Sequence, residues 1–229
     1  MPSGLYSFLA ASVLMVATLP ATAGVIIGGT RVVYDGARKE ASISVKNPEK
    51  IAPYLIQSWV ENIKGANTSK PPFIVTPPLF RLDAGKENIL RIVRTGGNLP
   101  TDRESLYWLS IKSIPASKKS DDNQLLISVK AQLKLIYRPE GLKGNANEAW
   151  KTLSFSRLGN TLQVTNPTPF YVSFQTIKVG SQEVDIKDSA TLAPMGSLNW
   201  VIPAGATGKV SWSAINDYGG ITEEASTAQ

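Results

Sequence analysis

The side chains that most often perform enzymatic or metal chemistry are missing from this sequence. The 229-residue chain contains no cysteine and no histidine. It can therefore form no disulfide, no thiolate nucleophile, no Ser-His-Asp triad and no zinc site of Cys and His ligands. A metal ion would need oxygen ligands only. We expect no catalytic residue, no metal site and no cofactor.

Carboxylates are the remaining groups that could carry acid–base chemistry. A secreted carbohydrate hydrolase would need two of them about 5–10 Å apart across a scissile bond. The candidates are Glu61, Asp83, Glu104 and Asp217, and nothing in their spacing indicates such a pair. The sequence therefore disfavours this enzyme class.

The net charge leaves several partners open. Lys and Arg total 24 against 18 Asp and Glu, which gives +6 at neutral pH. That excess suits a nucleic acid, an anionic surface or simple solubility. No stripe of clustered Lys and Arg with interleaved aromatic residues is visible, so we expect no nucleic-acid partner.

The most informative element is a long alternating stretch over residues 124–137. At about 3.3 Å per residue it could span more than 40 Å, longer than most strands. Its even-numbered face is polar and includes Lys134. Two interpretations stay open: an ordinary core strand, or an exposed edge whose apolar row awaits a partner strand. The apolar face carries Leu125, Ile127, Val129, Ala131, Leu133 and Leu135.

The first 23 residues have the pattern of a secretory signal peptide. An apolar run over residues 5–19 is followed by Pro20 and by Ala21-Thr22-Ala23, which fits a cleavage site before Gly24. The run lacks the usual preceding Lys or Arg, and it is short for a membrane span. We expect residues 1–23 to be cleaved on export.

The rest of the chain is predicted to be all-β. Short segments rich in β-branched and aromatic residues alternate with Gly and Pro turns, and no segment has a convincing helical period. A Gly- and Asn-rich seam at residues 139–149 predicts two sandwich domains, 24–142 and 143–229. The predicted strands are 41–45, 54–60, 73–75, 88–94 and 105–114 before the seam, and 150–155, 161–165, 170–179, 198–202 and 209–215 after it.

Six motifs in order give the chain a family resemblance. Together they resemble the PapD-like family of periplasmic pilus (fimbrial) chaperones of the chaperone–usher pathway, from about residue 25 to 220. The motifs are TRVVYDG at 30–36, TPP at 76–78 with RL at 81–82, DRESLYW at 102–108, KLIYRP at 134–139, NPTPFYV at 166–172 and INDYGG at 215–220.

The resemblance implies two immunoglobulin-like β-sandwich domains in a boomerang arrangement. Such chaperones bind pilus subunits in the periplasm, lend a strand to complete the subunit's fold, and deliver it to an outer-membrane usher without ATP. The sequence has no G-x-x-x-x-G-K-[ST] phosphate loop. The short loop at residues 115–124 resembles the class that assembles rod-like pili.

The resemblance also assigns roles to single residues. Arg31 and Lys134 match the cleft pair that anchors the subunit's C-terminal carboxylate, for which an Arg fork and a Lys point charge are suited. The donated apolar row would be Leu125, Ile127 and Val129. Lys134 has the opposite parity to this row, so either a bulge intervenes or the lysine reaches the cleft from the other face.

A charged trio is expected between the domains. By the resemblance, Glu104, Arg138 and Asp217 are structural and help to fix the interdomain angle. The closing strand of the second domain is expected to be short or absent. The alternative to a chaperone is a secreted immunoglobulin-like adhesion module, which would need neither the Arg31–Lys134 pair nor an unpaired strand. An exposed edge would also allow the free protein to associate with itself.

Overall fold

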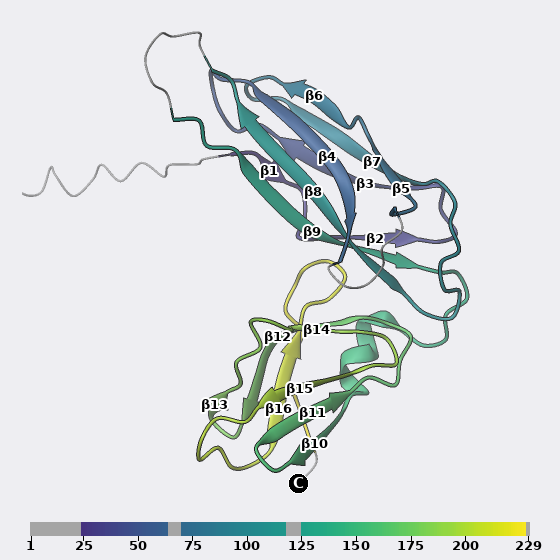
Figure 1. The fold of residues 1–229 in the computed structure, drawn as a ribbon, viewed down its shortest axis with the longest axis vertical. Helices are drawn as coiled ribbons and strands as arrows, with labels where there is room; N and C mark the ends of the chain where they lie inside the picture. The colour runs from purple at the N-terminus through teal and green to yellow at the C-terminus, as the bar shows by residue number, and fades with distance from the viewer. Residues whose placement is uncertain (1–23, 64–69, 118–124, 228–229) are drawn as a thin grey trace, which may run out of the picture.

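In a computed structural model the chain forms two β-sandwiches set at an angle to one another (Figure 1). The structure describes residues 24–63, 70–117 and 125–227, so the predicted signal peptide lies outside the described residues. Within these ranges no helix is long and apolar enough to cross a membrane. The prediction of an all-β chain with two sandwich domains is confirmed, while the boundary at residue 142 stays a prediction.

The N-terminal sandwich consists of a four-stranded and a five-stranded sheet. Apolar residues alternate along their strands, so each sheet turns one face to a shared core. Leu90 of one sheet and Leu109 and Leu135 of the other are fully buried there. The first sheet has the order β1 (Ile26–Ile27), β3 (Glu40–Lys46), β7 (Glu87–Arg94), β5 (Phe73–Thr76); the second has β2 (Arg31–Asp35), β9 (Val129–Arg138), β8 (Ser105–Pro115), β4 (Tyr54–Asn62), β6 (Leu79–Leu82).

The first segment of the chain crosses from one sheet to the other. β1 pairs antiparallel with β3, and β2 then pairs parallel with β9, from Arg31 opposite Lys134 to Asp35 opposite Arg138. The crossing passes Gly28, where a Cβ would collide with the Ser44 hydroxyl. Because β2 begins opposite Lys134, β9 has no partner on that side over Val129–Leu133 among the described residues.

The C-terminal sandwich is smaller and has a core rich in aromatic residues. Trp200 and Phe174 meet edge to face with ring centroids 5.6 Å apart, and Trp212 lies 4.4 Å from Phe155. One sheet is β10 (Ser154–Leu158), β11 (Thr161–Thr165), β15 (Ser197–Val201); the other contains β13 (Gln182–Glu183), β12 (Val172–Val179), β16 (Val210–Ala214) and β17 (Ala225–Ser226), with β14 (Thr191–Leu192) also paired to β12.

Two sequence-based element assignments change, and a third expectation is narrowed. The strand expected over residues 124–137 begins at Val129, because residues 125–128 have left the sandwich and form no strand. Trp150 lies in a 3₁₀ helix, Ala146–Lys151, and not in a strand; Asn145 caps this helix by accepting from the Asn147 amide. Of the two expectations for the closing strand of the second domain, short or absent, the structure has the short one: the two residues of β17 pair with β16.

Candidate functional site

Two cations lie side by side where the domains meet. Arg31 on β2 and Lys134 on β9 are direct partners in the parallel ladder. Lys134 Nζ donates to Ser173 Oγ at 2.8 Å and to Thr191 Oγ1 at 2.6 Å, and Arg31 Nη1 donates to the Ile215 carbonyl at 3.1 Å. Both side chains of the N-terminal domain therefore reach the C-terminal domain.

The two cations repel one another, and both are partly removed from solvent. Burial, and then the nearby Arg31 charge, lower the pKa of Lys134 to about 8. Burial also lowers the pKa of Arg31, against the opposing effect of Asp217. Among the described side chains, Arg31 Nε is a buried donor without a hydrogen-bond partner. Two partly desolvated cations with an unused donor are suited to bind an anion.

Lys134 reaches this position without a bulge. The β8–β9 pairing runs in constant register from Ser113 opposite Val129 to Ser105 opposite Tyr137. Leu133 and Leu135 point into the core, so Lys134 points away from it, toward the other domain. Of the two alternatives left by the sequence, the structure has the lysine on the opposite face of an unbroken strand.

The exposed fraction of the apolar row rises from Leu135 toward Leu125, in the N-terminal direction. Leu135 is 0% and Leu133 5% exposed, whereas Val129 is 44%, Ile127 67% and Leu125 87% exposed. The interpretation of these last three residues as core is therefore wrong. Exposed apolar side chains next to an unpaired strand edge form a surface that can accept another strand.

A polar cluster on the other face of this sheet was not found from the sequence. Its centre is Glu61 on β4, whose carboxylate accepts hydrogen bonds from Trp59 Nε1 (2.7 Å), Ser110 Oγ (2.7 Å), Lys130 Nζ (2.9 Å) and Gln132 Nε2 (2.9 Å). Although burial would raise the pKa of Glu61, the bonds from Lys130, Ser110 and Trp59 hold it at about 2. The cluster thus joins β4 to the first half of β9 across β8.

The expected charged trio lies together at the domain junction. Arg138 Nε donates to Glu104 Oε1 at 2.6 Å, and its two terminal nitrogens donate to Asp217 at 2.8 and 3.0 Å. Glu104 Oε2 accepts from the Tyr171 amide at 2.7 Å. The Glu104 side chain is 1% exposed, and burial raises its pKa against the effects of Arg138 and the Tyr171 amide. This network ties residues of both domains to one guanidinium.

The four carboxylates considered as a hydrolase pair are all engaged in hydrogen bonds or ion pairs with other side chains. Glu61 belongs to the sheet cluster, Glu104 and Asp217 both face Arg138, and Asp83 pairs with the exposed Arg81 at 2.7 Å. In the described ranges, no group of three Asp or Glu residues is placed to hold a metal ion.

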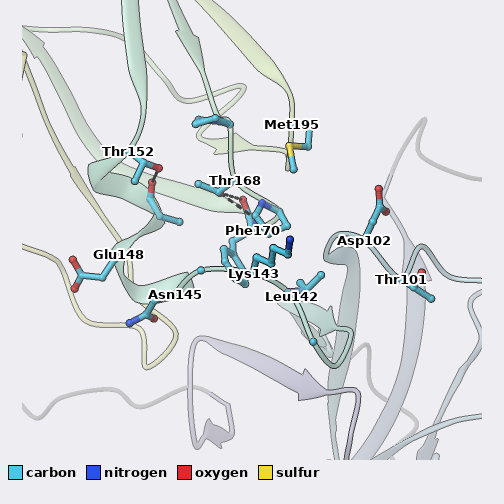
Figure 2. Close-up of a pocket in the computed structure, with 15 residues that line it drawn as sticks. Thr101, Asp102, Leu142, Lys143, Asn145, Glu148, Thr152, Thr168, Phe170 and Met195 are labelled. Atoms are coloured by element: carbon cyan, nitrogen blue, oxygen red, sulfur yellow. Dashed lines mark hydrogen bonds between the residues drawn. The ribbon is translucent and has the colours of Figure 1, made fainter.

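A separate hollow of about 570 Å³ lies at the junction, lined by the linker, the C-terminal domain, and Thr101 and Asp102 of the N-terminal domain (Figure 2). Its lining is mostly apolar, with Leu142, Phe170 and Met195, and includes none of the predicted binding residues. The NPTP motif forms one wall: Asn166 Oδ1 accepts from the Thr168 amide and hydroxyl, and Asn166 Nδ2 donates to the Phe170 carbonyl at 2.7 Å. This motif therefore shapes the junction.

Comparisons with known proteins cover nearly all of the described chain. Residues 24–143 match the family model described as "Pili and flagellar-assembly chaperone, PapD N-terminal domain". Residues 148–226 match "Pili assembly chaperone PapD, C-terminal domain".

Individual relatives agree with these matches. The probable fimbrial chaperone LpfB of Escherichia coli O157:H7 is 46% identical over 207 residues, 87% of this chain and 86% of the relative. The chaperone protein LpfB of Salmonella typhimurium is 47% identical over 204 residues, 86% and 85% of the two chains.

Two solved structures share the fold at substantial identity. The E. coli chaperone DraB has a TM-score of 0.77 and 40% identity, covering 90% of this chain and 96% of its own. A chain in the complex of the Salmonella enterica SafA pilin with the SafB chaperone has a TM-score of 0.81 and 36% identity, covering 92% and 99%.

Proposed function

The chain belongs to the PapD-like family of pilus-assembly chaperones, and from this premise we propose that it binds fimbrial subunits through the cleft between its domains. The family is one of chaperones and not of enzymes. The related SafB chaperone was solved with the SafA pilin, which supports a pilin-type client. The observation that carries the proposal is the Arg31–Lys134 pair, which lies directly at the end of the open edge of β9.

In this proposal the cation pair anchors the C-terminal carboxylate of the subunit. A carboxylate offers two acceptor oxygens, and the guanidinium of Arg31 and ammonium of Lys134 supply donors of matching charge. Each charge-assisted bond contributes about 1.5–3 kcal/mol. The anion would offset the repulsion between the two cations.

The open edge then completes the subunit. Over Val129–Leu133 the edge of β9 away from β8 has no partner among the described residues, so it can hydrogen-bond an incoming strand. The exposed row Leu125, Ile127 and Val129 can fill a groove in the subunit. Full burial of each such side chain contributes about 1.5–3 kcal/mol. In the free chaperone the same surface can pair with a second copy.

The remaining steps follow from the family and from the predicted signal peptide. The chaperone works in the periplasm, to which the signal peptide at residues 1–23 directs it before being cleaved, and delivers its subunit to an outer-membrane usher without ATP. The network of Glu104, Arg138 and Asp217 keeps both domains in the orientation that the cleft requires.

An affinity purification from the native periplasm tests the anchor. We expect the tagged mature protein to retain a small β-rich subunit, identified by mass spectrometry, and Arg31→Ala to lose it while keeping its melting temperature. Arg38→Ala is the control, because Arg38 is 77% exposed beside Asp35. Equal recovery by wild type and Arg31→Ala would refute the anchor; binding to a glycan array with no subunit recovered would support the adhesion module.

A further inference from the structure

The turn after β16 displays an aromatic side chain that the fold does not use. Tyr218 is 89% exposed, and Ile221 of the same turn is 63% exposed. The turn runs from the end of β16 toward the N-terminal domain, between the two sandwiches (Figure 1). A single exposed apolar residue is ordinary on a protein surface, so the support beneath Tyr218 decides its meaning.

The turn is closed by its own hydrogen bonds. Asn216 Oδ1 accepts from the amides of Tyr218 (3.0 Å) and Gly220 (2.9 Å). The Asn216 amide donates to the Gly220 carbonyl at 2.9 Å, and Ile215 bridges to Ile221. The backbone that carries Tyr218 is therefore fixed by local bonds.

The turn is also fastened to the N-terminal domain on both sides of Tyr218. Its neighbour Asp217 binds Arg138 through two oxygens, at 2.8 and 3.0 Å. Its other neighbour, Gly219, adopts φ of 85° and packs so closely on Thr30 that a Cβ would collide with the hydroxyl. Thr30 precedes Arg31, and Arg31 Nη1 donates to the carbonyl of Ile215. The position of Tyr218 is thus fixed relative to the anchor arginine.

A rigid support under an exposed Tyr is the arrangement of a preorganised binding residue. Tyr provides a large contact area at a low cost in conformational entropy, and it is enriched among the residues that dominate binding energy. Ordering the turn before binding removes that cost from the association step.

We propose that Tyr218, with Ile221, is a second contact for the subunit and packs on an apolar side chain in the subunit's last residues. This inference rests on the proposed anchoring of the carboxylate at Arg31. The turn is continuous with that anchor, so the residues that precede a bound carboxylate are the ones nearest to it.

Photo-crosslinking tests the contact directly. The probe is the pilin subunit that co-purifies with the wild-type chain, co-expressed with Tyr218→p-benzoylphenylalanine in the full chain. We expect a crosslink to the subunit's C-terminal tryptic peptide. The same substitution at Leu158, which is 62% exposed on β10, is the control and should give no such product. Crosslinks only to an usher, to a second chaperone copy, to another part of the subunit or to nothing would overturn the proposal.

Affinity measurements separate this proposal from the anchor. Tyr218→Ala should weaken subunit binding about tenfold or more with an unchanged melting temperature, and Tyr218→Phe should keep most of the affinity. If Arg31→Ala abolishes binding and Tyr218→Ala has no effect, the aromatic contact is wrong and the anchor stands. If Arg31→Ala binds normally, the anchor is wrong, whatever Tyr218→Ala does.

Discussion

Lys134 is a partly buried lysine whose surroundings do not neutralise its charge. Its hydrogen-bond partners in the structure, Ser173 and Thr191, are hydroxyls that orient the amine without neutralising its charge. Arg31 on the adjacent strand adds a like charge, and the pKa of Lys134 falls to about 8. An anion bound there, as proposed, would offset the cost of burying two like charges together.

The depressed pKa predicts a pH dependence of binding. Subunit affinity should decline between about pH 7 and about pH 9.5, by at most about tenfold per pH unit, because a deprotonated Lys134 cannot hold a carboxylate. Titration of Kd against pH for wild type and Lys134→Arg measures this. An affinity of the wild type that is flat over this range would contradict it; the Arg variant should be flat.

The same lysine predicts the opposite trend for stability. Its folded pKa, about 8, lies below the ordinary lysine value of 10.5. The unfolded chain therefore binds more protons between these values, so this group disfavours the folded state below about pH 8 and ceases to do so as pH rises toward 10.5. Denaturant unfolding at several pH values should show wild type gaining stability across this window relative to Lys134→Met.

At the level of elements, β9 is built in two halves. From Lys134 onward β9 pairs on both edges, whereas Val129 to Leu133 pair only with β8 among the described residues. The buried apolar side chains of β9 begin at Leu133. The Glu61 cluster binds Lys130 and Gln132 and so holds the less supported half in place.

Removing the cluster should loosen that half selectively. In Glu61→Ala, we expect amide hydrogen exchange of Val129–Ala131 to accelerate while the amides of Leu135–Tyr137 stay protected, because only the first half lacks a core. Asp83→Ala, which removes an exposed ion pair, is the matched control. Uniform acceleration along β9 would show that Glu61 supports the whole sheet instead.

The exposed row predicts a separation of binding from folding. Ile127→Asp and Leu125→Asp should abolish subunit binding and leave the melting temperature of the free chaperone nearly unchanged, because both side chains already face solvent. Thermal unfolding and subunit recovery from the periplasm measure the two effects. A large drop in melting temperature would return the row to a structural role.

The sequence predicted strands whose side chains alternate locally between apolar and polar, and it missed contacts that depend on which residues of different strands are neighbours. The alternation in 41–45 predicted both the strand and its buried face, and 54–60 and 105–114 were correctly predicted as strands. Trp150 misled because a buried Trp beside Ala149 has the same apolar pattern in a 3₁₀ turn as in a strand. The Glu61 cluster could not be predicted, since it requires knowing which residues of β4, β8 and β9 are neighbours.

For the whole molecule, one guanidinium carries much of the connection between domains. Arg138 binds Glu104, whose side chain is buried, and Asp217, which belongs to the other domain. A buried carboxylate that loses its partner is far more costly than an exposed one, so this network differs in kind from the ion pairs on the surface.

Breaking the network should both destabilise the protein and release the domain angle. For Arg138→Met we expect the free energy of unfolding to fall by about 3–5 kcal/mol, because Glu104 would remain buried without its counter-charge. Small-angle scattering should show a broader distribution of shapes. Arg103→Ala removes only the exposed pair with Asp102 and should change neither quantity. A rigid, equally stable Arg138→Met would assign the domain angle to the linker.

Under the proposed anchoring, the point at which β2 begins determines which clients can be accepted. A C-terminus held at Arg31 and Lys134 would fix the register of the incoming strand, because each residue further from that terminus lies about 3.3 Å further along β9. The cleft would then select clients by the number of residues between the C-terminal carboxylate and the apolar side chains. A client lengthened by one residue would turn its apolar side chains to the wrong face. A client lengthened by two residues would again turn its apolar side chains to the correct face, but each would be shifted by one position along that face.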